Sequence, residues 1–307
     1  GSSPQNVNFA IKSSYINSLL TNLPDTFIKH KGIVPVPIEQ SSFKERVKND
    51  IVLVEVVPQN PRNAEQPLAK NNSREKSQNE IIKPSRFNQK DIKKLKSLNN
   101  CKKCNLSGAN LSREKFKKAD MEEANLSYTN LSSADLSESN LTGSNLSKAN
   151  LESANLKSAN LTKADLSQAK LENSNLIYAN LSGSKLDGAS LVKANLSFTR
   201  LTNTSFKNSI LTKANLTGAK LSGANLSHAS LNGANLKRAG MYKVNLTGAD
   251  LTGAELPRSM KGVNLTGANL TNAILVDVDF SGSDLTRANL TGASLTGAKI
   301  DKATLCN

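Results

Sequence analysis

A large apolar side chain returns at every fifth position through the last two thirds of the chain. The spacing runs from Leu106 to Leu256, skips to Met260, and resumes from Leu265 to Leu305. Helices repeat about every 3.6 residues and strands about every 2, so this period fits neither. Forty positions keep the five-residue spacing, and leucine fills all of them except Phe116, Met121, Phe206, Met241, Phe280 and Ile300.

The remaining positions of each quintet predict which side chains face inward. In the stretch ANLESANLKSANLTKADL, at 149–166, a small residue lies two positions before each leucine and Asn or Asp lies one before it. The two positions after the leucine hold Ser, Thr, Gly, Lys or Glu in most quintets. We therefore expect the small residue and the leucine to be buried and the last two residues to be solvated. Asn and Asp side chains are suited to bonding turn backbone.

Residues 105–307 resemble the pentapeptide-repeat family, of the type common in cyanobacteria. The resemblance implies an all-β fold: a right-handed quadrilateral β-helix in which each quintet forms one side and four quintets form a coil. The one irregular stretch, LPRSMKGVNL at 256–265, loses a residue and places Pro257 and Arg258 in the shortened quintet. It predicts a bulge or kink, which would suit either a binding site or a tolerated deletion.

Residues 88–104 are predicted to cap the first coil with a helix. Asn88 is a suitable N-cap with Asp91 three residues later, as in a capping box. Ile92, Leu95 and Leu98 fall on or near one face. A cap is needed because an open coil end exposes sheet edges and leucine.

Cys101 and Cys104 follow the helix as a CxxC pair. They could form half of a metal site, a redox pair or a structural pair. Two ligands alone do not complete a metal site, and no thioredoxin-like βαβ pattern surrounds them. The structural pair, either reduced or as a local disulfide, is the favoured interpretation. No cofactor is predicted.

The first 87 residues form a different region. Residues 1–24 resemble the last strand and helix of a bacterial trypsin-like (HtrA-type) serine protease, with a strand at 8–11 and a helix capped by Ser13 or Ser14. No nucleophile motif of that family is present, so no catalytic residue is assigned. Residues 25–87 comprise a short strand at 51–57 and a polar linker predicted to be partly disordered. The chain would then be the C-terminal portion of a protease carrying a repeat appendage, and extracytoplasmic; otherwise a cytoplasmic location is expected.

Charge narrows the functions that the repeat could perform. The formal net charge is +15, and residues 101–307 hold 24 Lys and Arg against 16 Asp and Glu. An acidic rod that imitates DNA, a role of some gyrase-binding members of the family, is disfavoured by this balance. Positions twenty residues apart, which would stack, form no unbroken basic stripe, so no specific nucleic-acid site is expected. No apolar run is long enough to span a membrane.

The favoured function is a non-enzymatic rod that binds a protein partner or acts as a spacer. Tyr178 and Phe198 are twenty residues apart and both predicted to face outward. They could anchor a partner, or simply stabilise the sheet as a cross-coil pair. An uncapped last coil, ending near Leu305, predicts end-to-end pairing with a second copy.

Overall fold

The computed structural model describes residues 10–11, 52–53, 87–301 and 303, in two compact units, residues 1–76 and 77–307. In the first unit, β1 (Ala10–Ile11) and β2 (Val52–Leu53) pair in antiparallel fashion, with Ala10 opposite Leu53. Parts of the strands predicted at 8–11 and 51–57 are therefore present. The helix predicted after Ser13 or Ser14 and the linker, except for its last residue, lie outside the described residues.

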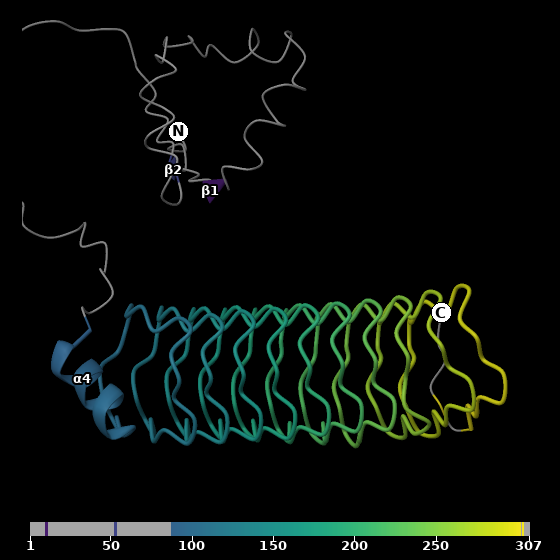
Figure 1. Cartoon of the computed structure of the whole chain (residues 1–307). Coiled ribbons are helices and arrows are strands. Elements are labelled where there is room, and N and C mark those ends of the chain that lie inside the picture. The colour runs from purple at the N-terminus through teal and green to yellow at the C-terminus, as the bar shows by residue number, and fades with distance from the viewer. Residues whose placement is uncertain (1–9, 12–51, 54–86, 302, 304–307) are drawn as a thin grey trace, which may run out of the picture. The chain divides into compact units, whose positions relative to one another are not determined.

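The second unit is a stack of four-sided coils (Figure 1). Parallel bridges join residues twenty apart, so that Asn105 pairs with Asn125 and Asn125 with Asn145. The amide of Leu106 donates to the carbonyl of Asn125, and the amide of Asn125 donates to the carbonyl of Cys104, both at 2.8 Å. Each side contributes a single bridge residue rather than a longer strand. Because one quintet forms one side, the four-sided coil that the family resemblance implied is confirmed.

Every regular corner is a turn with one left-handed residue. The carbonyl of Leu106 accepts a 3.0 Å hydrogen bond from the amide of Ala109, and between them Gly108 has a φ of +71°. A positive φ at the third residue alone is the signature of a type II turn. The Asn105 side chain fixes the turn by accepting from the amide of Ser107 at 3.2 Å, the role predicted for it. The Asn125 side-chain amide also donates to Asn105 Oδ1, at 3.3 Å.

The interior consists of the leucines and the small residues before them, as predicted. The leucines from Leu126 to Leu236 have no exposed surface, and most of the alanines are equally buried. Where Ser or Thr replaces the alanine, its hydroxyl donates to a leucine carbonyl, either three residues earlier, as Ser139 does to Leu136 at 2.7 Å, or in the preceding coil, as Thr129 does to Leu106 at 2.8 Å. Throughout the described residues, no buried side-chain nitrogen or oxygen lacks a hydrogen-bond partner.

Helix α4 (Gln89–Leu98) caps the first coil (Figure 1). Its N-cap is Asn88, whose side chain accepts from the amide of Lys90 at 3.0 Å. Leu95 is 1% exposed and packs on the leucine column, but Leu98 is 68% exposed. The expectation that Leu98 shares the buried face was therefore wrong. It is the last helical residue, three positions beyond Leu95, and the turn that follows carries the chain into the coil.

Asp91 does not complete a capping box, which corrects the second expectation for this helix. Its carboxylate accepts from the amide of Asn105 at 2.9 Å, while the amide of Asn88 donates to the carbonyl of Asn105 at 2.9 Å. The helix start is thus bonded to the first coil instead of to itself. The amide and the carbonyl of Asn105 have no preceding coil among the described residues to pair with, and these two bonds to the helix satisfy both of them. The other end of the stack, at Leu305, lies outside the described residues.

The leucine column predicts a sharp contrast between two leucine-to-alanine variants. Leu196→Ala should lower the free energy of unfolding by about 2–5 kcal/mol, because it leaves a cavity in a fully packed column. Leu98→Ala removes the same atoms from a side chain that is 68% exposed and should change stability little. Urea unfolding followed by circular dichroism would measure both, and equal losses would contradict the interior described above.

Acid should destabilise the stack, and Asp279 shows why. The Ser281 hydroxyl and amide and then the Lys261 ammonium, 3.0 Å away, lower the pKa of Asp279 to about 2. Since an unfolded Asp has a pKa of about 3.9, this carboxylate adds stability that is complete above about pH 4. That stability is lost as the pH falls toward 2. Asp279→Asn keeps an acceptor oxygen but no charge. Its melting temperature should therefore fall less steeply than wild type over that range, and parallel curves would count against the assignment.

Candidate functional site

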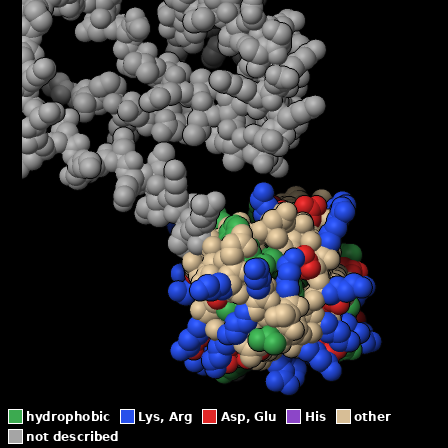
Figure 2. Space-filling view, turned by 60° about the vertical axis from the view of Figure 1, so that its left-hand side comes forward, with side chains coloured by type: hydrophobic (Ala, Val, Ile, Leu, Met, Phe, Trp, Pro, Cys, Tyr) green, Lys and Arg blue, Asp and Glu red, His purple; other side chains and the backbone are tan. Residues whose placement is uncertain are grey.

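The outer surface carries charges of both signs on all the sides in view (Figure 2). Several ion pairs join neighbouring coils, such as Lys102 with Glu122 at 2.9 Å and Lys103 with Glu123 at 3.3 Å. Exposed pairs of this kind contribute about 0–1 kcal/mol each. The charges therefore stabilise neighbouring coils modestly, and on the face in view basic and acidic side chains are interspersed.

Tyr178 and Phe198 are brought together as the sequence predicted. Their ring centroids are 5.5 Å apart with 21° between the planes, so the rings are stacked. Tyr178 remains 58% exposed and Phe198 47% exposed. Both occupy the third turn position, two residues after a leucine, on one corner of the coil. We call this line of residues the aromatic corner; it continues through Gly218 to Arg238 at twenty-residue intervals.

Both aromatic residues adopt a backbone conformation that aromatic side chains rarely take. Their φ angles are +61° for Tyr178 and +58° for Phe198. A left-handed residue with a Cβ costs about 1–2 kcal/mol, whereas glycine adopts the conformation freely. Many corners use glycine, serine or lysine at this position. The fold therefore does not require aromatic rings at these two corners, and stacking can offset only part of the backbone cost, about 0.5–1.5 kcal/mol.

Gly218 makes room for the Phe198 ring. A Cβ built on Gly218 would lie 2.7 Å from two carbons of that ring, closer than atoms can approach. The ring thus lies over a bare backbone position of the next coil. The same arrangement places His228, an exposed residue, over Gly248. A glycine twenty residues after a ring-bearing turn residue is a sequence signal that could have predicted this contact, although no expectation above was drawn from it.

Two other tyrosines of the described residues, Tyr128 and Tyr242, are also exposed but differ from this pair. Lys148 Nζ lies 5.1 Å from the centre of the Tyr128 ring and donates to its hydroxyl at 3.0 Å. Lys243 Nζ lies 5.3 Å from the centre of the Tyr242 ring. Each of these tyrosines is therefore engaged by a lysine. Among the described residues, only Tyr178 and Phe198 present a continuous aromatic surface.

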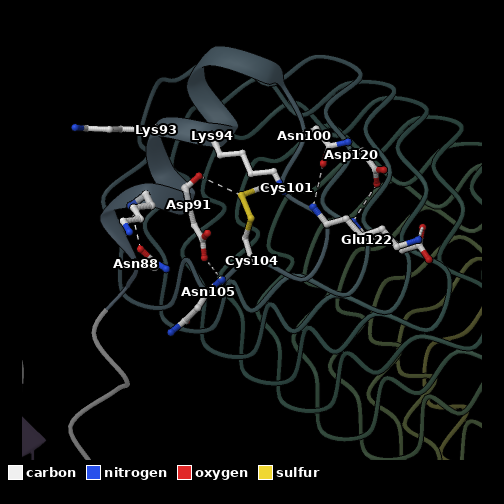
Figure 3. Close-up of a disulfide and its surroundings, with 12 residues drawn as sticks. Asn88, Asp91, Lys93, Lys94, Asn100, Cys101, Cys104, Asn105, Asp120 and Glu122 are labelled. Carbon is white, nitrogen blue, oxygen red and sulfur yellow. Dashed lines mark hydrogen bonds and ion pairs between the residues drawn. A yellow bond between two sulfur atoms is a disulfide. The ribbon is translucent and has the colours of Figure 1, made fainter.

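Cys101 and Cys104 form a disulfide beneath α4 (Figure 3). The ladder begins one residue earlier, where Asn100 bridges to Asp120, so the two cysteines take the leucine and small-residue positions of the first side. Both are buried, and Cys101 Sγ lies 3.2 Å from the carbonyl oxygen of Asp91. This contact is not a hydrogen bond in the oxidised state, because a disulfide sulfur carries no proton to donate. In the oxidised state neither sulfur is a thiolate ligand or nucleophile.

The described residues contain no constellation typical of an enzyme's metal site. No group of three or more His, Cys, Asp or Glu side chains among them is placed to hold a metal ion. Of the two histidines, His228 is an isolated surface residue and His30 lies outside the described part. The one described helix is also too short and too polar to cross a bilayer.

The repeats match a known protein family along most of the chain. Overlapping segments spanning 104–256 and 264–301 match the family model for pentapeptide repeats (8 copies). The chain belongs to the pentapeptide-repeat family. Membership carries the right-handed quadrilateral β-helix with it. The matched segments of this pentapeptide-repeat protein leave out 257–263, the irregular stretch, and they do not reach residues 1–24, so the protease resemblance gains no support.

Solved structures of the family are similar to this pentapeptide-repeat protein in sequence. HetL, involved in heterocyst differentiation regulation in the cyanobacterium Nostoc sp. strain PCC 7120, is 32% identical, over 71% of this chain and 98% of HetL, with a TM-score of 0.28. Rfr23 from the cyanobacterium Cyanothece 51142 is 32% identical, over 49% of this chain and 97% of Rfr23, with a TM-score of 0.29. QnrB1, a plasmid-mediated fluoroquinolone resistance protein, is 27% identical, over 60% and 88%, with a TM-score of 0.32. No curated protein sequence matches the chain.

The contact between Phe198 and Gly218 yields a test by double-mutant cycle. Gly218→Ala and Gly267→Ala both place a Cβ at a φ near +65°, but only the first also meets the Phe198 ring, since nothing lies within 4 Å at Gly267. We expect Gly218→Ala to cost about 1–3 kcal/mol more than Gly267→Ala. In a Phe198→Ala background the two costs should become equal. If the difference persists without the ring, the ring does not lie over Gly218.

Proposed function

We propose that this protein is a non-enzymatic interaction rod that binds a protein partner through Tyr178 and Phe198. The observation that carries the proposal is the exposed aromatic stack on a corner where the backbone disfavours aromatic side chains. Aromatic residues dominate the binding energy of protein interfaces, because they bury a large area at a small cost in conformational entropy. A stiff rod presents such a surface without rearrangement, which reduces the cost of binding.

The surroundings of the pair suit an interface. Ile177, half-buried and next to Tyr178 in the chain, lies at an outer turn position that most quintets fill with polar residues; Val192, also half-buried, lies at the preceding corner of the coil. Arg200 is exposed, two residues after Phe198. An apolar centre with a polar and cationic edge is the usual composition of a protein-binding surface. The partner would then place an apolar or aromatic side chain against the rings.

A purely structural role for the pair makes a different prediction. If the rings serve only to hold two coils together, their removal should lower stability and leave binding to the folded protein unchanged. If they form an interface, their removal should abolish binding. Alanine variants separate the two roles, because alanine keeps a Cβ at the same left-handed φ and only the rings are lost.

A pull-down from the protein's own cells tests the proposal. Tyr178→Ala combined with Phe198→Ala should lose a partner that the wild-type chain retains, with a change of less than about 1.5 kcal/mol in stability, the energy of one aromatic pair. Tyr128→Ala combined with Tyr242→Ala is the matched control, since it removes two exposed rings elsewhere and should retain the partner. Retention of every partner by the first variant would refute the proposed surface.

A further inference from the structure

The irregular stretch opens a cavity on the side of the rod. Its volume is about 600 Å³, within the range of about 300–1,000 Å³ typical of ligand pockets. The residues around it come from three successive coils: Lys237 and Arg238 before the break, Glu255, Leu256 and Arg258 at the break, and Ile274 and Val276 after it.

The cavity exists because one corner turn is missing. Between Leu256 and Met260 no residue has a positive φ, and bridges across the break join residues nineteen apart, such as Glu255 and Ile274. The amides of Arg238 and Met241 accordingly lose their ladder bonds, and within the described residues neither donates to a carbonyl. The backbone ladder is therefore interrupted at Arg238, which lines the cavity.

The lining is apolar where the repeat is elsewhere polar. Ile274 occupies the bridge position that Asn235 and Asn215 fill on the same side two and three coils earlier, respectively, and it is 45% exposed. Val276 replaces a polar turn residue and is 43% exposed. Leu256 is 7% exposed, whereas the leucines from Leu126 to Leu236 have no exposed surface. These side chains form an accessible apolar patch of the kind that an aliphatic side chain would cover.

The charges around this patch are unequal. Glu255 is paired with Lys237 at 2.8 Å, so its carboxylate is neutralised locally. Arg238 and Arg258 are both exposed, and neither forms an ion pair with any described residue. Two guanidinium groups beside an apolar patch are complementary to a carboxylate that is close to an aliphatic group, because arginine pairs with carboxylates through two parallel hydrogen bonds.

We propose that this cavity binds an acidic peptide segment, with an aliphatic side chain on Leu256, Ile274 and Val276 and an adjacent Asp or Glu between Arg238 and Arg258. The cavity lies on the aromatic corner, with Arg238 two coils beyond Phe198, or about 10 Å at the usual spacing of neighbouring strands. Three extended residues span that distance. The inference thus builds on the proposed function by naming the chemistry of the partner.

A labelled peptide tests the cavity without knowledge of the natural partner. Fluorescein-labelled GSLELEG amide is titrated with the full chain and followed by fluorescence anisotropy, with GSLQLQG amide as its uncharged twin. We expect saturable binding of the acidic peptide, and at least about fivefold weaker binding of the twin because it loses the charge-assisted bonds. Arg238→Gln combined with Arg258→Gln should weaken binding of the acidic peptide to the same extent.

Two further variants make the result specific to the cavity. Arg113→Gln combined with Arg287→Gln removes two exposed arginines from other corners and should leave affinity unchanged, since the net charge falls equally. Ile274→Asn combined with Val276→Ser restores polar residues common at these positions of the repeat, so it should fold, and it should weaken binding at least about fivefold by removing the apolar patch.

The proposal is overturned by no saturable binding up to about 1 mM, the limit of weak specific affinity. It also fails if the two arginine double variants weaken binding equally, or if the variant of Ile274 and Val276 binds like wild type. If the peptide titration fails but the variant without Tyr178 and Phe198 loses its partner, only the cavity proposal is refuted, and the proposed protein-binding function stands. If the peptide binds as expected but the variant without the two rings keeps every partner, the aromatic surface is refuted and the cavity proposal stands.

Discussion

A side of only five residues can close into a coil because one residue of each quintet takes a left-handed conformation. The corner turn, from a leucine carbonyl to the amide three residues later, holds the chain at this angle, and the Asn or Asp side chain before the leucine supports it. Once the corner is formed, the leucine and the small residue point inward and the ladder bonds follow. The stack therefore rests on a repeated local constraint, and burial of the leucine column compensates for its backbone cost.

The same constraint decides where the surface can vary. The left-handed residue projects its side chain outward and toward the next coil, so its size is coupled to the residue twenty positions later. With the rings as they lie, a Cβ on Gly218 would clash with Phe198 and a Cβ on Gly248 would clash with His228. The interior thus does not limit the size of an outer side chain, but the neighbouring side chain in the next coil does. A surface feature on this rod must extend along a corner, as the line from Tyr178 to Arg238 does.

Periodicity was sufficient to predict the interior of the coils and the Asn and Asp turn bonds. These depend on contacts that recur in every quintet, so forty weak signals reinforce each other. The exposure of Leu98 and the hydrogen-bond partner of Asp91 could not be predicted in this way, because both depend on how a single helix packs against a single coil. The stacking of Tyr178 on Phe198 followed from the twenty-residue coil, but the left-handed strain that makes the pair informative required backbone angles. The cavity required knowledge of how the chain crosses the break.

The break shows how much irregularity such a stack can absorb. Met260 is fully buried and takes the place of a leucine, so the apolar column continues although a corner turn is lost. The cost falls on the ladder, where Arg238 and Met241 lose their bonds, while Leu236 still donates to Glu255 at 2.8 Å. Because each coil contacts only its neighbours, the disturbance ends within one coil. A solenoid can therefore form a pocket by omitting one residue, at a local cost in hydrogen bonds, and place arginine and aliphatic side chains around it without altering the rest of the rod.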